Sequence, residues 1–409
     1  MGDQGEKNSS VDEIKAFLTE GFPETDATIL KNRLDSLIVN GVVSLSPTSS
    51  SSNPLERSPS LLDDITPDER FKIVRSIGEE CIKDAELMRL LKNKPEPIAY
   101  DGFEPSGGGC TLHRLTDAGC RVKILVAGVF ARLNHKLSGD KENIRVAGKY
   151  FMEIWKAIGM KNLDKVEFVW SSDAINSRAA EYWDLVLDIV GSFSGERIKN
   201  CCAIMGRAEN EDLNPGQLMY PCMQCADIFL LEADICQLGM DQRKVNMLAR
   251  EYWTKIKKRK NKPRMLSQRT HNMLPGLKKG QEKMSKSDPS SAIFMEDNED
   301  EVDKKINNAH CVEGTVEGNP CFEYIKHIIF PWFQEFEVER SEEHGGNKTF
   351  KNLEDLISDY QSKKLHPVDL KAALAKALNR ILKPVRDHFN NDPEAKALLD
   401  KVKEYKVTK

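Results

Sequence analysis

The 409-residue chain contains no apolar stretch long enough to cross a membrane, so a spanning helix is not expected. Its opening residues, MGDQGEKNSSVDEI, lack the apolar core of a secretory signal and hold too much acid for a transit peptide. Glu6 also stands where a myristoylation signal needs Ser or Thr. These absences predict a protein of the cytosol with no membrane partner.

An excess of basic residues is absent as well. The chain has 60 Lys and Arg against 64 Asp and Glu, which gives a formal net charge of −4. Wholesale nucleic-acid binding is therefore not indicated, and any RNA contact must come from a local basic patch. One candidate patch is made of Lys257, Lys258, Arg259, Lys260, Lys262 and Arg264. The alternative interpretation of this segment is a helix end that is exposed to solvent.

The ten cysteines lack the dense spacing of a disulfide framework. Cys222 and Cys225 form a C-x-x-C pair without a matching second pair, whereas a zinc site usually takes four ligands. We therefore expect reduced thiols and no metal site.

Composition and periodicity divide the chain into four parts. Residues 1–43 carry apolar residues at helical spacing and predict a helical extension, and residues 44–65 form a Ser/Pro-rich linker. Strand patterns alternate with helical patterns over residues 66–299, which predicts an α/β domain with a doubly wound parallel sheet. Helical periodicity dominates residues 300–409 and predicts a mainly α-helical C-terminal domain.

Individual elements follow from local signals. A capping box at Thr66 and Glu69, with Pro67 between them, predicts a helix that runs toward Leu91. Apolar runs predict buried strands at Ile98–Tyr100, Val122–Ala127 and Val166–Trp170. Helices are expected at Ile144–Ile158, Ala179–Val190, Val245–Lys258, Pro320–Phe336, Leu353–Tyr360 and Asp369–Phe389.

The loop GLKKGQEKMSKSDP, residues 276–289, is the most informative segment for function. Its glycines allow movement, and Lys283 and Lys286 place two ammonium groups where a polyphosphate can bind. A cationic loop that closes over departing pyrophosphate stabilises the transition state more than the ground state. The loop thus predicts chemistry that expels pyrophosphate from ATP, and an ordinary lysine-rich surface loop is the alternative.

The string KMSKS within this loop resembles the second signature of the class I aminoacyl-tRNA synthetases. Several further segments are similar to the tyrosyl-tRNA synthetases of eukaryotes and archaea: YDGFEPSG at 100–107, LMYPCMQCADI at 218–228, MDQRK at 240–244, GGNKTF at 345–350 and HPVDLK at 366–371. The resemblance covers residues 66–390. It implies L-tyrosine, ATP with Mg²⁺ and tRNA(Tyr) as substrates, and a homodimer joined through an insertion at about 145–200.

The same resemblance assigns residue roles. It implies that Tyr100 and Asp227 hold the substrate phenol, while its ammonium end is held by Tyr220, Gln224 and Gln242. The implied catalytic residues are Lys283, Ser285 and Lys286, and the implied ATP contacts are Gly102, Glu104, Met284 and Lys286. The implied anticodon contacts are His344, His366 and Asp369, where His344 replaces the usual Trp or Tyr and predicts weaker stacking.

Residue chemistry supports tyrosine as the substrate. Pro221 suits a first helical turn, so Gln224 and Asp227 are expected to share one face of a helix. A buried carboxylate is a good acceptor for a phenol, and a site built this way rejects Phe by about 10⁵ because its polar groups stay unpaired. A tryptophanyl enzyme would share the KMSKS loop but is not expected to have Asp at position 227.

One part of the pattern is missing. The first nucleotide signature of the class, a His that opens a long helix, should follow EPSG almost at once. Only fourteen residues lie between Gly107 and Val122, whereas a helix of about five turns needs roughly eighteen residues. After the next strand, Gly128 also stands where an Asp is usual, and it is followed by Val129 and Phe130.

Two hypotheses explain this departure. We favour a lost segment, in a degenerate paralogue or a gene model with an error, which predicts impaired adenylation and leaves a tRNA- or tyrosine-binding protein as the alternative function. The other hypothesis is a divergent enzyme in which GGGC, residues 107–110, forms a substitute phosphate loop.

Overall fold

A computed structural model describes the chain in nine segments: 65–77, 80–104, 112–158, 163–202, 212–239, 242–256, 264–268, 274–281 and 288–405. The predicted extension 1–43, most of the predicted linker 44–65 and the KMSKS residues 283–287 lie outside them. In the part of the chain that is described, no helix is long and apolar enough to span a membrane.

The N-terminal helix begins as predicted. Thr66 and Glu69 cap α3, Pro67–Arg75, through reciprocal hydrogen bonds, and Pro67 occupies the first turn. The helix does not continue to Leu91, because the chain forms the edge strand β1, Glu80–Cys81, before α4, Asp84–Asn93. β1 pairs antiparallel with β6, Arg264–Gln268, so pairing with a strand that is distant in the sequence overrides the local helical pattern.

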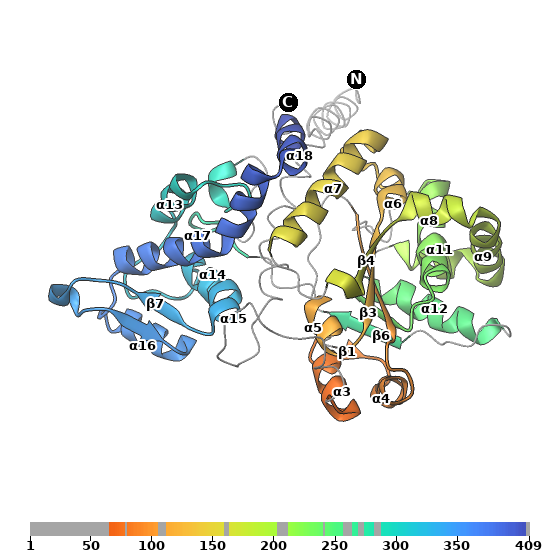
Figure 1. The fold of residues 1–409 in the computed structure, drawn as a ribbon, viewed down its shortest axis with the longest axis horizontal. Coiled ribbons are helices and arrows are strands. Elements are labelled where there is room, and N and C mark those ends of the chain that lie inside the picture. Colours follow the sequence, from red (N-terminus) through yellow and green to blue (C-terminus); the bar gives the residue numbers. More distant parts are fainter. Residues whose placement is uncertain are drawn as a thin grey trace, which may run out of the picture.

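The central sheet confirms the predicted α/β class. Its six strands lie in the order β1-β6-β5-β2-β3-β4, and all neighbours except β1 and β6 are parallel (Figure 1). The four strands not yet bounded are β2, Ile98–Phe103; β3, Arg121–Val126; β4, Val166–Trp170; and β5, Ile235–Gly239. The three strands expected from apolar runs are therefore present, with β2 three residues longer than predicted.

Helices cover this sheet and confirm the predicted α/β alternation. They are α5, Leu112–Asp117; α6, Gly128–Leu133; α7, Lys141–Ala157; α8, Ser171–Ser177; α9, Ala179–Ser192; α10, Gly195–Lys199; α11, Pro215–Leu230; and α12, Arg243–Lys255. Single 3-10 turns lie at Lys136–Gly139, Leu163–Lys165 and Pro289–Ser291. α11 packs against both α9 and α12.

The C-terminal part is mainly helical, as predicted. Its helices are α13, Glu299–Asn307; α14, Pro320–Tyr324; α15, Phe330–Phe333; α16, Leu353–Gln361; α17, Pro367–Asn391; and α18, Pro393–Glu404. A π-helical turn, Ile325–Ile329, joins α14 to α15, so the helix expected over 320–336 is present only in pieces. The sequence did not predict the hairpin of β7, Phe336–Val338, and β8, Lys348–Phe350, which encloses a 3-10 turn at Glu342–His344.

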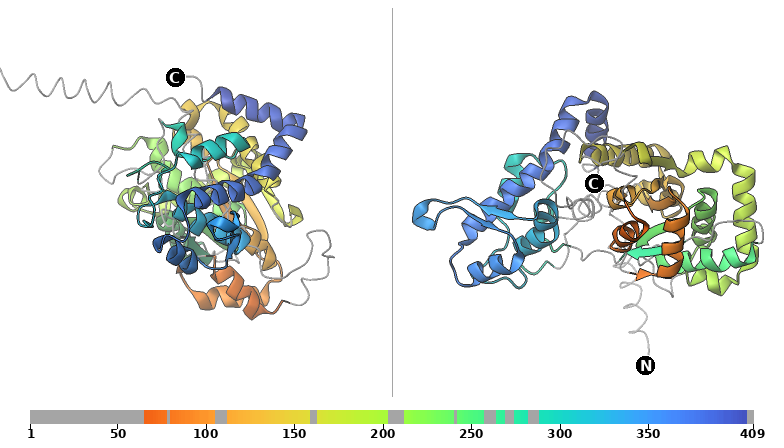
Figure 2. Two further views of the ribbon diagram at one scale, coloured as in Figure 1. Left: turned by 90° about the vertical axis from the view of Figure 1, so that its left-hand side faces the viewer. Right: turned by 60° about the horizontal axis from the view of Figure 1, so that its bottom comes forward.

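The C-terminal part lies to one side of the sheet and contacts the α/β part of the chain at α7. α18 packs against α7, as Figure 1 and the right-hand view of Figure 2 show. The Tyr150 ring lies 5.4 Å from that of Phe389, centroid to centroid, and His388 Nε2 lies 2.8 Å from Glu153 Oε2. One hydrophobic core runs through both parts.

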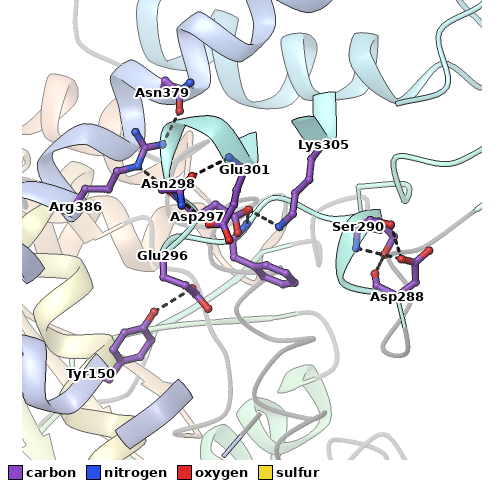
Figure 3. A network of polar contacts seen from close by, with 12 residues as sticks. Tyr150, Asp288, Ser290, Glu296, Asp297, Asn298, Glu301, Lys305, Asn379 and Arg386 are labelled. Atoms are coloured by element: carbon purple, nitrogen blue, oxygen red, sulfur yellow. Dashed lines mark hydrogen bonds and ion pairs between the residues drawn. The ribbon is translucent and has the colours of Figure 1, made fainter. Parts of the chain in front are cut away.

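A polar network joins the segment after the KMSKS loop to both parts (Figure 3). The Tyr150 hydroxyl donates to Glu296 over 3.3 Å, and Arg386 Nε of α17 donates to the Asp297 carbonyl over 2.7 Å. Lys305 Nζ lies 2.6 Å from the Asp297 carboxylate, which is 6% exposed. Burial raises the pKa of this carboxyl, and Lys305 opposes that rise. The ion pair thus closes residues 297–305 on themselves, and Arg386 holds the segment against α17.

Candidate active site

The strand order defines where a ligand should bind. β2 is followed by β3 and β4 on one side, while β5 and β6 lie on its other side. In a doubly wound sheet, ligands bind at such a reversal, outside the carboxyl ends of the strands. The predicted tyrosine and ATP contacts among the described residues lie on or directly beside β2, α11 and α12: Tyr100, Gly102, Glu104, Tyr220, Gln224, Asp227 and Gln242.

Tyr100 and Asp227 form the buried centre of this group, each with 2% of its surface exposed. Burial raises the pKa of Asp227 well above its usual range, and the neighbouring Tyr182 hydroxyl opposes that rise. Burial and then the Asp227 charge also raise the pKa values of Tyr100 and Tyr182. The three side chains therefore make a small polar island within an apolar cluster.

This island has unused hydrogen-bonding capacity. Asp227 Oδ2 and the Tyr182 hydroxyl are both buried, and among the described residues neither has a hydrogen-bond partner outside this island. Buried polar atoms are almost always paired in native proteins, so an unpaired set marks a place for a polar ligand group. A Cβ added at Gly102 would lie 3.1 Å from the Tyr100 hydroxyl, so the absence of a side chain at Gly102 leaves room for that group.

The sequence did not predict Tyr182 as a member of the site. Its neighbours on the buried face of α9, Leu185, Val186 and Ile189, give it the appearance of a core residue. Its approach to Asp227 depends on α9 packing against α11, which no local pattern records.

Glu104 and Tyr220 connect the end of β2 to α11. The Tyr220 hydroxyl donates to Glu104 Oε1 over 2.8 Å, and Asn134 Nδ2 donates to the same oxygen over 3.1 Å. The Tyr220 ring packs edge-on against Phe130, with centroids 4.8 Å apart. Glu104, which the resemblance assigns to ATP, therefore orients Tyr220 in this structure.

The two predicted glutamines also meet. Gln224 Nε2 donates to Gln242 Oε1 over 2.8 Å, which joins α11 to the N-cap of α12. Gln224 is only 7% exposed. Carbonyl and amide groups arranged in this way suit an ammonium or carboxylate of a zwitterion.

The predicted position of Pro221 was wrong. α11 begins at Pro215, behind a capping box of Asn214 and Gln217, so Pro221 lies in the helix interior. A proline there leaves the carbonyl four residues earlier without its helical donor. The Cys202 thiol donates to that carbonyl, of Gln217, over 3.6 Å. Gln224 and Asp227 still share a buried face, as predicted.

The C-x-x-C cysteines of α11 are buried, and burial raises the pKa values of both Cys222 and Cys225. In the described residues, a group of potential metal ligands occurs elsewhere, at Glu153, His388 and Asp392. Lys156 Nζ lies 2.6 Å from Glu153 Oε1, so this carboxylate already has a cationic partner.

The predicted catalytic loop is described only at its ends, because Lys283, Met284, Ser285 and Lys286 lie outside the described residues. Lys278 and Asp288 form an ion pair across the base of the loop. Leu277 N also donates to the Ser291 carbonyl over 2.9 Å, and Gly276 N to the Gln281 carbonyl over 3.0 Å. Both ends of the loop are therefore fixed to the folded chain.

The segment after β2 agrees with the predicted loss of the long helix. Among the described residues, only α5, a helix of six residues, lies between β2 and β3. Gly128 begins α6 directly beyond the end of β3, where a Cβ would lie 3.4 Å from the Ile144 side chain. Apolar packing occupies the place of the usual carboxylate.

The predicted anticodon contacts lie near one another in the C-terminal part. His366 caps α17 by accepting from Val368 N at 3.2 Å, and Asp369 lies in the first turn of that helix. His344 is exposed on the hairpin turn, with Nδ1 2.8 Å from Ser341 Oγ. Arg340, which the sequence did not single out, joins the two segments: Nε donates to the Gly346 carbonyl over 2.8 Å and Nη1 to the Lys364 carbonyl over 2.7 Å.

Comparisons with known proteins agree with this geometry. Residues 92–383 match the family model described as tRNA synthetases class I (W and Y). Tyrosine–tRNA ligase 1, cytoplasmic, of Arabidopsis thaliana is 58% identical over 387 residues, which cover 92% of this chain and 98% of that protein. Tyrosine–tRNA ligase 2, cytoplasmic, of the same plant is 61% identical over 349 residues, which cover 83% of this chain and 46% of that protein.

Solved structures show the same relationship. The tyrosyl-tRNA synthetase of Leishmania major in complex with tyrosinol superposes with a TM-score of 0.70 at 43% identity, over 84% of this chain and 54% of that chain. This chain thus spans about half the length of the Leishmania protein. The Pyrococcus horikoshii tyrosyl-tRNA synthetase complexed with L-tyrosine gives a TM-score of 0.70 at 32% identity, over 82% of this chain and 100% of that chain.

The parallel sheet, the site at its reversal point and the family match define a class I tRNA synthetase fold. Within that class, the chain belongs to the tyrosyl-tRNA synthetases, and its plant relatives are cytoplasmic tyrosine–tRNA ligases.

Proposed function

We propose that this chain binds L-tyrosine between β2, α9 and α11, activates it with ATP and transfers it to tRNA(Tyr) in the cytosol. The buried island of Tyr100, Tyr182 and Asp227 is the observation that supports tyrosine most directly. A phenol hydroxyl placed there can hydrogen-bond to these buried groups, whereas a phenylalanine ring buries them without a partner. Unpaired buried groups are how such sites reject Phe by about 10⁵.

The other end of the amino acid is assigned to the polar groups that link α11 to its surroundings. Tyr220, which Glu104 orients, and the bonded pair Gln224 and Gln242 face the ammonium and carboxylate. Each of these side chains has a fixed partner before substrate arrives. Such pre-positioning reduces the entropy lost on binding.

The reaction has two steps. The tyrosine carboxylate attacks the α-phosphorus of ATP and pyrophosphate leaves; then a hydroxyl of the tRNA terminal ribose attacks the carbonyl carbon and AMP leaves. The first step needs no general base, so positioning and charge stabilisation supply the rate. We assign charge stabilisation to Lys283 and Lys286 with Ser285 and Met284 beside them, and Mg²⁺ enters as the counter-ion of the triphosphate.

Adenylation is expected to be slower than in relatives with an intact first signature. A long helix presents unpaired N–H groups to the triphosphate, and six-residue α5 lacks the length to replace it. The same observation favours a second candidate function, a protein that binds tyrosine or tRNA(Tyr) without activating tyrosine.

We also propose a homodimer formed through residues 145–200. On α9 of this segment, Trp183, Leu187 and Val190 are 42%, 62% and 42% exposed, and they recur at helical spacing on the face opposite the core. An apolar stripe of this kind marks an interaction surface.

Tyrosine-dependent exchange of labelled pyrophosphate into ATP, measured on the full chain beside calorimetric tyrosine binding, separates the two functions. Exchange above the tyrosine-free background supports the ligase. Tyrosine binding with no exchange supports the binding protein, and absence of both contradicts the proposal.

A further inference from the structure

The segment between α13 and α14, together with the first turn of α14, brings Cys311 and Cys321 together near α17. Cys311 is partly buried, and Cys321, in the first turn of α14, is fully buried with 0% exposure. Both cysteines are free, and Asn319 lies between them: its Oδ1 accepts from Cys321 N over 3.1 Å, while its Nδ2 faces the Cys311 sulfur.

The Cys311 sulfur is surrounded by donors. Asn319 Nδ2, which can only donate, lies 3.3 Å from it, and the Tyr360 hydroxyl lies 3.1 Å from it. The Lys371 ammonium adds a positive potential. These groups favour the charged form of the Cys311 sulfur, so they lower the pKa of Cys311; the hydrogen bond from Cys321 has the largest effect, followed by those from Tyr360 and Asn319. The contact with Cys311 and burial raise the pKa of Cys321.

Tyr360 has a single proton and two acceptors for it. Its hydroxyl lies 2.9 Å from the Val312 carbonyl and 3.1 Å from the Cys311 sulfur. When Cys311 is a neutral thiol, Tyr360 donates to Val312 and accepts from the thiol. When Cys311 is a thiolate, the proton turns to the sulfur, so Tyr360 adjusts to either charge state without a change of position.

Cys81 shows the contrast within the same molecule. It is also partly buried, but burial and the nearby Asp84 raise the pKa of its thiol to about 11. Accessibility alone thus does not separate the two thiols; the donors around Cys311 do.

We propose that Cys311 and Cys321 form a peroxide-sensitive pair, in which the Cys311 thiolate reacts with hydrogen peroxide and Cys321 resolves the product to a disulfide. The Cys311 sulfur attacks one peroxide oxygen, the O–O bond breaks, and the second oxygen leaves as hydroxide, which takes a proton to become water. The Cys321 sulfur then attacks the sulfur of the Cys311 sulfenic acid. The hydroxyl of the sulfenic acid leaves and takes the proton of the Cys321 thiol, which gives a second water. Two thiols and one peroxide thus give one disulfide and two waters.

The disulfide changes the surroundings of α17. A disulfide sulfur is a poor acceptor, so Asn319 and Tyr360 lose an anionic partner and Lys371 of α17 loses an opposite charge. Tyr360 lies at the end of α16, six residues before His366, and Lys371 lies in the same helix as Asp369. The modification site and the proposed anticodon contacts therefore share one small unit, but the oxidation chemistry does not depend on the proposed function.

Mass spectrometry of the full chain tests this pair directly, because both cysteines fall in one tryptic peptide, residues 306–326, and Cys81 falls in another. We expect iodoacetamide at neutral pH to label Cys311 at least about tenfold faster than Cys81. After limited hydrogen peroxide, peptide 306–326 should resist alkylation and be lighter by two hydrogens. Cleavage after Glu313, Glu317 and Glu323 should leave the fragments 306–313 and 318–323 linked.

Variants assign the order of the two steps. In Cys321→Ser, dimedone should trap a sulfenic acid on Cys311, while in Cys311→Ser, Cys321 should stay reduced. Tyr360→Phe should slow labelling of Cys311 several-fold and leave Cys81 unchanged. Equal labelling of Cys311 and Cys81 in the wild-type chain, or peroxide oxidation that leaves both thiols of the 306–326 peptide free, overturns the proposal.

Discussion

The Tyr220 hydroxyl donates a 2.8 Å hydrogen bond to Glu104, and this contact fixes α11 against the end of β2. Tyr220→Phe removes it while keeping the ring and its packing on Phe130. Since one such bond contributes about 1 kcal/mol or somewhat more, we expect the Kd for tyrosine to rise about tenfold.

Isothermal titration calorimetry of Tyr220→Phe against tyrosine measures this effect. Tyr150→Phe is the matched control, because it also deletes a tyrosine-to-glutamate hydrogen bond, to Glu296 at the junction with the C-terminal part. It should leave the tyrosine Kd unchanged. An equal rise in the tyrosine Kd in both variants would contradict the role assigned to Tyr220.

Asp227 should give the stability of the fold a specific pH dependence. Burial raises its pKa in the folded chain above the unfolded value of about 4, so the fold favours the protonated form. Its stabilising contribution is full below pH 4 and is lost as pH rises toward the folded pKa. Asp227→Asn removes this loss, so the melting temperature of the variant relative to wild type should increase from pH 4 to pH 8, while tyrosine binding is weakened.

Asp288→Asn provides the control of opposite sign. Its hydrogen bond to Lys278 lowers the pKa of Asp288, so that contribution is present above pH 4 and is lost as pH falls. Thermal unfolding followed by circular dichroism across the pH range compares the two variants. If the melting temperatures of the two variants, relative to wild type, change with pH in the same direction, the raised pKa assigned to Asp227 is wrong.

Arg340 should act on tRNA binding and not on tyrosine activation. Its guanidinium bonds two carbonyls, of Gly346 and Lys364, and so joins the His344 turn to the start of α17. Lysine cannot reproduce this fork. We expect Arg340→Lys to weaken tRNA(Tyr) binding about tenfold, as measured by filter binding, with tyrosine Kd unchanged.

Arg380→Lys is the matched control, since exposed Arg380 lies 3.7 Å from Glu337 and over the Phe333 ring, contacts that do not involve the His344 turn or the start of α17. It should bind tRNA(Tyr) like the wild type. A loss of tyrosine affinity in Arg340→Lys would mean that Arg340 supports the fold as a whole.

The exposed stripe on α9 should control oligomeric state. Leu187→Glu places a charge at the centre of the proposed dimer surface and should convert a dimer to a monomer in sedimentation equilibrium. Val368→Glu is a matched control, because Val368 and Leu187 are both 62% exposed. A wild-type monomer at micromolar concentration, or dissociation by both variants, contradicts the proposed interface.

The sequence predicted the elements that carry their own pattern. The apolar runs of β2, β3 and β4 and the Thr66 capping box needed no tertiary information. β1 and the β7–β8 hairpin were not predicted, because three residues or fewer in a strand give no periodicity. Pro221 was misplaced because the prediction overlooked the capping box of Asn214 and Gln217, which begins α11 at Pro215 and puts Pro221 in the helix interior.

The site divides in the same way. The resemblance supplied Tyr100, Gln224, Asp227 and Gln242, and the structure places these side chains in one region. Tyr182 and Arg340 were not found, since their roles depend on contacts with Asp227 and with backbone carbonyls that only the fold creates.

Equilibrium binding of tyrosine against phenylalanine tests the central claim most directly, because it reports on the buried island and is independent of the ATP half of the site. On the full chain without ATP, we predict calorimetric binding of tyrosine and binding of phenylalanine weaker by at least about 100-fold. Equal affinity for both amino acids, or no binding of tyrosine, would contradict the account.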